Sequence, residues 1–504
     1  MSKETKKNRT SSNLKADAGP SDPGLRSVVC GLQSPVCGLR SPVTGHWSVV
    51  CSLWSVVFNL AYGLFGLFYL PVFCMKMKQA EDPRRLLRER LGWIAPETLR
   101  KISGRRTVWV HAVSVGEVMA LREFLKGFLE RFPELHGVLS TVTPTGQKIA
   151  RELESPRLSV VYFPFDFSFS CRKFFEQLKP DCLLLAETEI WPNLLLEAGR
   201  AGVRVGILNA RLSRKSARRY RRFLKLFAPL FQRIDFIFSQ TGQDALRFES
   251  LGIERSRIEV LGNMKLDQMP SAGMDPALSA KEKAKWGYGP EDRIWVAGST
   301  HPGEEEMVFE VLRDLRAEFP GLKMILAPRH IERSSRILEL AKKWGVEAEL
   351  SEPFQPGRRR EVLILNQLGV LKDIYSFADV VFVGGSLVSK GGQNPVEPAV
   401  FRKGILHGPH VFNFETLYQW LDLQGGSRAV NDRPALHNAV VKLLRDPAER
   451  SLFGDKAFGA VLEMRGATAR HLDRVQHFLP GKPQERINDG AFDTKLFPQV
   501  GGRL

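Results

Sequence analysis

The chain has 504 residues, of which 43% are hydrophobic and 10% aromatic, so it has enough apolar material to fill two domain cores rather than one. Its formal net charge of +18 indicates a polyanionic neighbour, which can be nucleic acid, anionic lipid or a phosphorylated substrate. Four of the six cysteines precede residue 76, and Cys171 and Cys182 have no metal-ligand spacing. A disulfide framework and a zinc site are therefore disfavoured, and a reducing cytoplasm is expected.

The first 76 residues differ in composition from the rest of the chain. Residues 1–45 hold a polar segment and a seven-residue repeat (SVVCGLQ, SPVCGLR, SPVTGHW), and we expect a disordered extension there. No Lys, Arg, Asp or Glu occurs between Arg40 and Lys76, and this apolar stretch exceeds the roughly 20 residues that cross a bilayer. Residues 46–76 are predicted to be a retained membrane anchor, spanning the bilayer or lying in its interface; a cleaved signal peptide is the alternative. Basic residues follow the anchor at once, which places the remaining chain in the cytoplasm.

From Thr107 onward, short apolar runs typical of strands alternate with helical segments, which predicts parallel, doubly wound sheets. The predicted strands are TVWVHAV, GVLSTVT, LSVVYFP, DCLLLAE, VRVGILNA and DFIFSQ in the first half and RIWVAGST, LKMILAP, EVLILNQ, DVVFVGG and GILHGP in the second. A Pro-, Ser- and Gly-containing stretch interrupts the alternation, which then resumes. Neither half has a GxGxxG fingerprint or a GxxxxGK[ST] loop, so dinucleotide and P-loop sites are disfavoured. The predicted fold class is α/β with two Rossmann-like domains facing a cleft, the layout of GT-B glycosyltransferases. The predicted parts are an N-terminal domain at 77–267, a linker at 268–280, a C-terminal domain at 281–480, across which the helical segment 433–479 packs, and a tail at 481–504.

Two motifs in the first half place carboxylates where strands end. Glu117 follows a buried strand and a Ser114/Gly116 turn; it is either a general base that faces the cleft or a residue that complements the helix dipole. Glu187 and Glu189 follow the strand DCLLLA, at the edge where α/β folds bind ligands, although one of them can simply cap the next helix.

A basic segment at 211–225 reads RLSRKSARRYRRFLK and has a helical apolar stripe opposite its charges. It is either a solvated surface or a contact for anionic lipid headgroups or substrate phosphates.

Three loops in the second half suit a nucleotide. GSTHPGEE at 298–305 follows a strand and opens a helix, which predicts backbone N–H groups that are free to bind an anion. Arg329 ends the next strand and can form a two-pronged pair with phosphate. The Gly-rich run at 384–398 leads into a helix whose Glu397 can accept both hydroxyls of a ribose. Each loop alone is a turn, but together they favour a nucleotide site.

These residues closely resemble the 3-deoxy-D-manno-octulosonic acid (Kdo) transferase family. The resemblance runs from about residue 50 to about residue 478 and includes RERLGWIAP at 88–96. Eight further blocks occur in one order: HAVSVGE (111–117), STVTPTG (140–146), AETEIWPN (186–193), NARLS (209–213), GNMK (262–265), GSTHPGEE (298–305), APRH (327–330) and GGSLVSKGGQNPVEPA (384–399).

The resemblance implies a GT-B fold and inverting, metal-independent transfer of Kdo from CMP-Kdo to the lipid A precursor lipid IV(A). It implies an N-terminal anchor in the inner membrane of a Gram-negative bacterium with the catalytic domains on the cytoplasmic face, membrane lipids as neighbours and no cofactor. Glu117 is then the general base, and Glu187 and Lys265 support the transition state. The residues implied to hold CMP are Pro328, Arg329, Gly369, Val370, Leu371, Asn394, Pro395, Val396 and Glu397. Further donor or acceptor contacts are expected at Ser114, Gly116, Thr145, Gly146, Glu189, Ser299, Thr300, His301, Gly385 and Ser386.

Two alternatives stay open at this point. The first is a GT-B transferase that uses a UDP-sugar on a lipid-linked acceptor. The second is a membrane-tethered nucleic-acid-binding protein, although the chain lacks the interleaved aromatic and basic residues of such modules, so no nucleic acid is expected. The number of Kdo residues added and the oligomeric state do not follow from the sequence.

Overall fold

The computed structural model describes residues 45–78, 80–269, 275–353 and 360–479. The extension predicted at 1–45, except for Gly45, and the tail predicted at 481–504 lie outside these ranges; the end of the last quoted repeat, residues 45–47, is helical. Within them the chain forms two parallel sheets of seven strands each, so the predicted α/β class with two Rossmann-like sheets is confirmed.

The sheet of the N-terminal lobe has the order β3-β2-β1-β4-β5-β6-β7, with every neighbouring pair parallel. The chain steps outward from β1 to β3 and then returns to lay β4 beside β1. The loops after β1 and β4 therefore leave the sheet at its topological switch point, where open α/β sheets bind ligands. The strands are β1 (Arg106–His111), β2 (Leu135–Thr141), β3 (Leu158–Tyr162), β4 (Cys182–Ala186), β5 (Arg204–Ala210), β6 (Phe236–Ser239) and β7 (Ile258–Val260).

Helix α4 shows why the N-terminal helices pack on this sheet. Leu121, Phe124, Leu125 and Phe128 recur at three- and four-residue spacing and are all buried in one cluster with Val108 of β1. The helices of this lobe are α2 (Pro83–Arg90), α3 (Pro96–Ile102), α4 (Val115–Arg131), α5 (Pro144–Arg151), α6 (Ser168–Leu178), α7 (Pro192–Arg200), α8 (Arg214–Arg222), α9 (Leu224–Phe231), α10 (Gly242–Glu249) and the short 3₁₀ turns η1 (Arg255–Arg257) and η2 (Met264–Leu266).

The sheet of the C-terminal lobe has the order β10-β11-β9-β8-β12-β13-β14 and is also parallel. Its switch point lies between β8 and β12. The strands are β8 (Ile294–Thr300), β9 (Lys323–Pro328), β10 (Ala348–Leu350), β11 (Val362–Ile364), β12 (Val380–Val383), β13 (Ile405–His407) and β14 (Ser427–Ala429).

Helices cover this second sheet by the same logic. Val308, Leu312 and Leu315 of α12 are spaced at four and three residues and are buried with Trp295 of β8. Helix α11 begins at Pro276, inside the range 268–280 predicted as linker. The helices are α11 (Pro276–Lys285), α12 (Glu304–Arg316), α13 (Ser334–Lys343), α14 (Leu371–Tyr375), α15 (Val396–Val400), α16 (Glu415–Leu423), α17 (Arg433–Arg445), α18 (Pro447–Glu463) and the 3₁₀ turn η3 (Ile331–Arg333).

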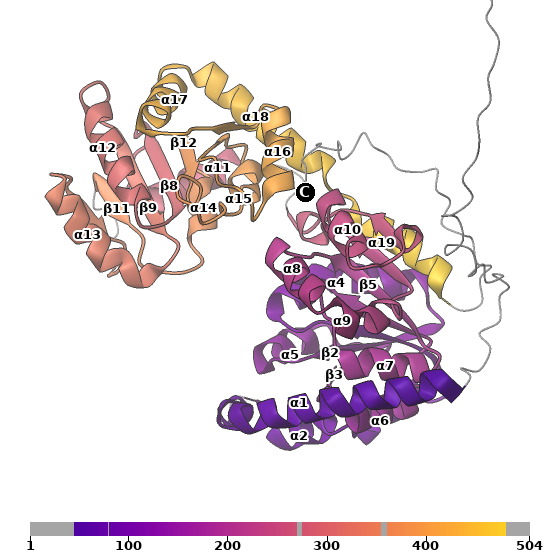
Figure 1. Cartoon of the computed structure of the whole chain (residues 1–504). Helices are drawn as coiled ribbons and strands as arrows, with labels where there is room; N and C mark the ends of the chain where they lie inside the picture. The colour runs from indigo at the N-terminus through magenta and orange to yellow at the C-terminus, as the bar shows by residue number, and fades with distance from the viewer. Residues whose placement is uncertain (1–44, 79, 270–274, 354–359, 480–504) are drawn as a thin grey trace, which may run out of the picture. The chain divides into compact units, whose positions relative to one another are not determined.

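The last described helix, α19 (Ala467–Val475), belongs to the N-terminal lobe (Figure 1). Ala467, Val475 and Leu479, which follows the 3₁₀ turn η4 (Gln476–Phe478), are buried in the same cluster as Val108 and Phe124. Arg474 forms a two-pronged pair with Glu259 at 2.7 and 2.8 Å. The prediction that residues 433–479 all pack across the C-terminal domain is therefore wrong for residues from 467 onward, because the helical pattern fixes a buried face but not the sheet that buries it.

From Ser52 onward, helix α1 (Gly45–Lys78) lies along the N-terminal lobe beside α6 and α7 (Figure 1). Asn59 donates to Ser168 Oγ at 2.8 Å and accepts from Asn193 at 3.2 Å, and Tyr62 meets Phe167 edge to face. The opposite face exposes large apolar side chains, among them Leu60, Leu64 and Phe68 at 70, 63 and 80%. Among the described residues, no helix combines the length and apolar character needed to cross a membrane.

Candidate functional site

Glu117 lies at the switch point of the N-terminal lobe, in the first turn of α4 after the N-cap Ser114. Its side chain is almost fully buried. One carboxylate oxygen accepts from Val113 N at 2.8 Å and the other from Ser114 Oγ at 2.9 Å. The carboxylate is thus held in place by residues of its own turn, which is typical of a residue at the start of a helix. Each oxygen still has a lone pair that can accept from another donor.

Glu187 and Lys265 form an ion pair beside this turn, with Nζ and Oε1 2.5 Å apart. Glu187 directly follows β4 and has a φ of 54°, a left-handed conformation that costs a non-glycine residue energy and is often found at functional positions. Lys265 lies in η2. A β4 loop and a segment that follows β7 therefore meet at one point.

The pKa values of Glu117 and Glu189 indicate that both carboxylates interact with Glu187, and that Glu189 also interacts with Glu117. Burial raises the pKa of Glu117, with Glu187 acting in the same direction and Lys265 opposing it. Burial also raises the pKa of Glu189 to about 7, with further upward contributions from Glu117 and Glu187. Glu117, Glu187, Glu189 and Lys265, predicted from separate motifs, are thus brought together.

The start of α5 completes this part of the lobe. The N-cap Thr143 accepts from Gly146 N at 3.0 Å, and a Cβ at Gly146 would lie 3.5 Å from the Ser114 carbonyl carbon and the Val113 oxygen. These are ordinary van der Waals distances, so the start of α5 lies directly against the turn that holds Glu117. Thr145 and Gly116 lie in the first turns of α5 and α4, so the helix starts predicted as contacts are neighbours.

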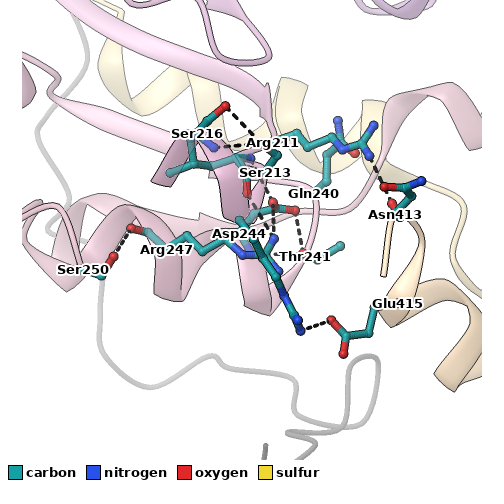
Figure 2. A network of polar contacts seen from close by, with 12 residues as sticks. Arg211, Ser213, Ser216, Gln240, Thr241, Asp244, Arg247, Ser250, Asn413 and Glu415 are labelled. Atoms are coloured by element: carbon teal, nitrogen blue, oxygen red, sulfur yellow. Dashed lines mark hydrogen bonds and ion pairs between the residues drawn. The ribbon is translucent and has the colours of Figure 1, made fainter. Parts of the chain in front are cut away.

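A polar network fixes the start of the basic helix α8 (Figure 2). Asp244 of α10 accepts from Leu212 N at 2.9 Å and Thr241 Oγ1 at 2.6 Å, and Arg247 pairs with it at 3.2 Å. Ser213 then caps α8 through Ser216 N at 3.1 Å. The basic helix predicted within 211–225 is present as α8, with its Arg and Lys side chains exposed. The apolar stripe predicted opposite them is not continuous, because the helix ends before Phe223, which is exposed, and α9 begins after it.

In the C-terminal lobe, the loops after β8 and β12 meet at the switch point. Ser299 has a φ of 57°, and Thr300 Oγ1 donates to Glu305 at 3.0 Å. His301 is buried, and its ring lies 3.5 Å from the Gln393 amide nitrogen. Burial lowers the pKa of His301, and His330, Lys390, Arg333 and Arg329 lower it further.

The prediction that backbone N–H groups of the 298–305 loop are free to bind an anion is wrong for His301. Its N–H donates to the carboxylate of Glu304 at 2.9 Å, and Gly385 N and Ser386 N donate to the same carboxylate at 2.7 and 3.0 Å. The sequence shows a Glu in a first helical turn, but it does not show that the β12 loop folds onto it.

Arg329 directly follows β9, and Glu397 lies in the first turn of α15. Arg329 N donates to Thr300 O at 2.9 Å, and Thr300 pairs with Pro328 in the sheet. Burial raises the pKa of Glu397, while Asn394, Lys372 and Arg329 oppose the rise. Asn394 receives Val396 N at 3.1 Å and donates to Glu397 at 3.3 Å, which fixes the start of α15 after Pro395.

The loop before α14 contains the remaining residues that were predicted to hold CMP. Gly369 has a φ of 87°, with no atom near the position that a Cβ would take, and Val370 is the N-cap of α14. Lys372 of this helix influences Glu397, so α14 and α15 present their starts to the same region. Sequence reasoning missed Lys372, which stands in none of the motifs. It included Glu304 in the block at 298–305 but missed its role, because that role depends on the β12 loop far along the chain.

Two parallel doubly wound sheets, each with polar side chains at its switch point, define a GT-B-like protein. Solved structures of the same fold include a glycosyltransferase from Rickettsia africae (TM-score 0.53, 11% identity, covering 75% of this chain and 100% of that one). A UDP-N-acetylglucosamine 2-epimerase has a TM-score of 0.51 at 16% identity, covering 76% of this chain and 98% of that one.

The sequence comparisons identify the family. A family model described as 3-deoxy-D-manno-octulosonic-acid transferase (kdotransferase) matches residues 85–268. The 3-deoxy-D-manno-octulosonic acid transferase of Haemophilus influenzae is 31% identical over 398 residues, which cover 79% of this chain and 92% of that protein. The transferase of the same name from Bordetella pertussis is 31% identical, covering 74% and 87%. The chain belongs to this family of Kdo transferases and is a glycosyltransferase.

Proposed function

We propose that this Kdo transferase takes Kdo from CMP-Kdo and adds it to the lipid A precursor lipid IV(A), with inversion at the anomeric carbon and without a metal ion. The observation that carries the proposal is the pair of switch-point sites. One holds a buried carboxylate beside a lysine–carboxylate pair. The other has Arg329, whose N–H donates to Thr300 O at 2.9 Å, and Glu397 in the first turn of α15. The first suits a sugar hydroxyl that must lose a proton, and the second suits a nucleotide.

In the proposed reaction an acceptor hydroxyl attacks the anomeric carbon of Kdo. The new glycosidic bond forms while the bond from that carbon to the CMP phosphate oxygen breaks, and the hydroxyl proton passes to Glu117. CMP leaves with one more negative charge on its phosphate. Arg329 stabilises this charge, as a guanidinium pairs well with phosphate oxygens.

Glu187 and Lys265 support the transition state in this proposal. Lys265 keeps part of its side chain accessible while it pairs with Glu187, so its ammonium can also meet an anionic group on the sugar. The nucleotide is held by Pro328, Arg329, the loop from Gly369 to Leu371, and the run from Asn394 to Glu397.

We also propose that α1 attaches the protein to the cytoplasmic face of the inner membrane by lying in its interface. The support is the apolar outer face of α1, opposite the face that Asn59 and Tyr62 tie to the lobe. Basic residues next to such a face favour anionic lipid.

One assay tests the function. The purified protein is incubated with lipid IV(A) and CMP-Kdo, and the mass of the lipid product is measured by mass spectrometry. A mass gain of one or more Kdo units is expected. Binding of UDP instead of CMP, together with no mass gain, would favour a UDP-sugar transferase.

A further inference from the structure

Glu304, the first residue of α12, is a carboxylate with no solvent exposure in the middle of the C-terminal lobe. It accepts four backbone hydrogen bonds. His301 N and Gly385 N donate to one oxygen at 2.9 and 2.7 Å, and Ser386 N and Leu387 N donate to the other at 3.0 and 2.9 Å. None of the residues predicted to hold CMP was expected to accept backbone hydrogen bonds in this way.

The four amides come from both loops of the switch point. One belongs to the loop after β8 and three to the loop after β12. Converging amides of this kind commonly hold a phosphate in nucleotide-binding folds, but here a side chain of the protein supplies the anion. Burial raises the pKa of Glu304, and the amide donors act in the opposite direction; amide bonds to an ionised carboxylate are among the stronger hydrogen bonds in proteins.

The two loops are packed at backbone contact around this carboxylate. A Cβ at Gly384 would lie 2.7 Å from Thr300 Cα and 2.9 Å from Glu304 Oε2. A Cβ at Gly385 would lie 3.2 Å from the ring of His301. The Glu304 carboxylate therefore determines how closely the loops approach and where the His301 ring stands.

Basic side chains that are separate from the four amide donors act on His301. His330, Lys390, Arg333 and Arg329 all lower its pKa, and Arg333 is already paired with Glu305 at 2.9 Å. An anion that enters this region meets cationic side chains, because the amides are occupied.

We propose that Glu304 is a positioning residue for the donor nucleotide: its carboxylate occupies the amide nest of the switch point, joins the β8 and β12 loops, and leaves the phosphate of the donor to side chains such as Arg329 and Lys390. This inference rests on the proposed function. It adds to that function that the four backbone amides bind the carboxylate of Glu304 and not the phosphate of the nucleotide.

The test measures CMP binding by calorimetry for the wild type and Glu304→Gln. The glutamine places an NH₂ group against amide donors, so we expect the loops to separate and CMP affinity to fall about tenfold or more. The KM for CMP-Kdo should rise in parallel, while kcat changes by less than about threefold. The matched control is Glu306→Gln in the same helical turn, which accepts only from Gly303 N at 3.1 Å in an exposed position and should bind CMP normally.

A second variant guards against a loss of fold. Glu304→Asp keeps the charge but is one methylene too short to hold both loops, so it too should weaken CMP binding. If folded Glu304→Gln or Glu304→Asp protein has a lower melting temperature but binds CMP as the wild type does, Glu304 is merely structural and the inference is wrong. A wild type that does not bind CMP contradicts the proposed function instead.

Discussion

Glu117 has the hydrogen bonds of a helix-start residue and the location of a catalytic one. Its bonds to Val113 N and Ser114 Oγ are those that a carboxylate in a first turn makes with its own backbone. The same bonds hold the carboxylate still at the switch point, and burial makes it a stronger base. The geometry fits both a helix-start residue and a general base. Only for a general base does removing the charge of the side chain lower turnover strongly.

Glu117→Gln should lower turnover by about 10²–10⁴-fold, the usual contribution of a general base. The amide keeps the size of the side chain but cannot take the proton. CMP affinity should stay nearly unchanged, because the proposed nucleotide residues lie on the other sheet. Turnover, CMP affinity and melting temperature are measured on one preparation. A folded variant with near-normal turnover would show that Glu117 only stabilises the helix, which costs at most about 1 kcal/mol when lost.

The pH dependence of the reaction offers an independent check on the same residue. A general base works only when deprotonated, so activity should fall as pH drops through the pKa of Glu117. Because that pKa is raised, the acid limb of kcat/KM should lie above the ordinary glutamate range near 4.3. The residual activity of Glu117→Gln should lack this limb. An acid limb at the same pH in both proteins would assign it to another group.

Arg329→Ala should weaken CMP binding by about 1.5–3 kcal/mol, the value of a charge-assisted hydrogen bond to phosphate. Calorimetry measures the affinity. Arg336→Ala, which removes an exposed arginine from α13, is the matched control and should bind normally. Equal affinity in all three proteins would remove Arg329 from the donor site.

At the scale of elements, the sequence predicted the interior strands well and the sheet edges poorly. Runs such as Cys182–Ala186 are wholly apolar because both faces of a parallel sheet are covered. The strands that were not predicted are β7, β10 and β14, each three residues long and each the edge strand of its sheet. The fourth edge strand, β3, has five residues and was predicted. Three residues are too few to show a period, and an edge strand is defined by its partner rather than its own composition.

Helix α19 has a role that only the tertiary structure reveals. His471 is fully buried; its Nδ1 donates to Ala467 O at 2.7 Å and its Nε2 accepts from Asn209 N at 3.1 Å. Asn209 Oδ1 in turn accepts from Met264 N at 3.0 Å, one residue before Lys265. The C-terminal helix therefore helps to place the lysine that pairs with Glu187.

His471→Phe should therefore reduce turnover without changing CMP affinity. The ring still packs against Phe238, but Asn209 N loses its acceptor, which costs about 1–3 kcal/mol for a buried donor. His471→Gln, which retains an acceptor, should recover part of the turnover. If both variants lose stability equally while each keeps wild-type turnover, α19 does not position Lys265.

Buried His471 also makes stability depend on pH in a defined direction. Burial lowers its pKa to about 4, against about 6.5 for a free histidine. The unfolded chain therefore binds the proton first, so the stability contribution of His471 is present above pH 6.5 and is lost as pH falls toward 4. Denaturant unfolding of wild type and His471→Gln should give curves against pH that converge over this range; parallel curves would contradict the assignment.

At the scale of the whole molecule, each sheet carries one part of the proposed chemistry. The motifs predicted which residues gather on each sheet because all of them follow strands, and parallel strands end at one edge. The sequence could not predict the closed amide nest around Glu304 or the return of α19 to the first sheet, since both depend on segments far apart in the chain.

The outer face of α1 gives the prediction that concerns the molecule as a whole. Leu60, Leu64 and Phe68 protrude from the side of α1 that does not contact the lobe. If this face enters a membrane interface, burying each side chain contributes about 1.5–3 kcal/mol, so changing all three to Gln should weaken vesicle binding by at least about a thousandfold. The bonds of Asn59 to Ser168 and Asn193 are untouched, so the lobe should stay folded and CMP binding normal.

Co-sedimentation with anionic phospholipid vesicles in high salt measures the effect, because salt screens basic surface contacts and leaves apolar ones. The matched control changes three exposed leucines of the C-terminal lobe, Leu278, Leu423 and Leu452, to Gln. That control removes a similar exposed apolar area without touching α1, so it should sediment with vesicles as the wild type does. Equal loss of binding in both triple variants would mean that general surface hydrophobicity, not α1, holds the protein at the membrane.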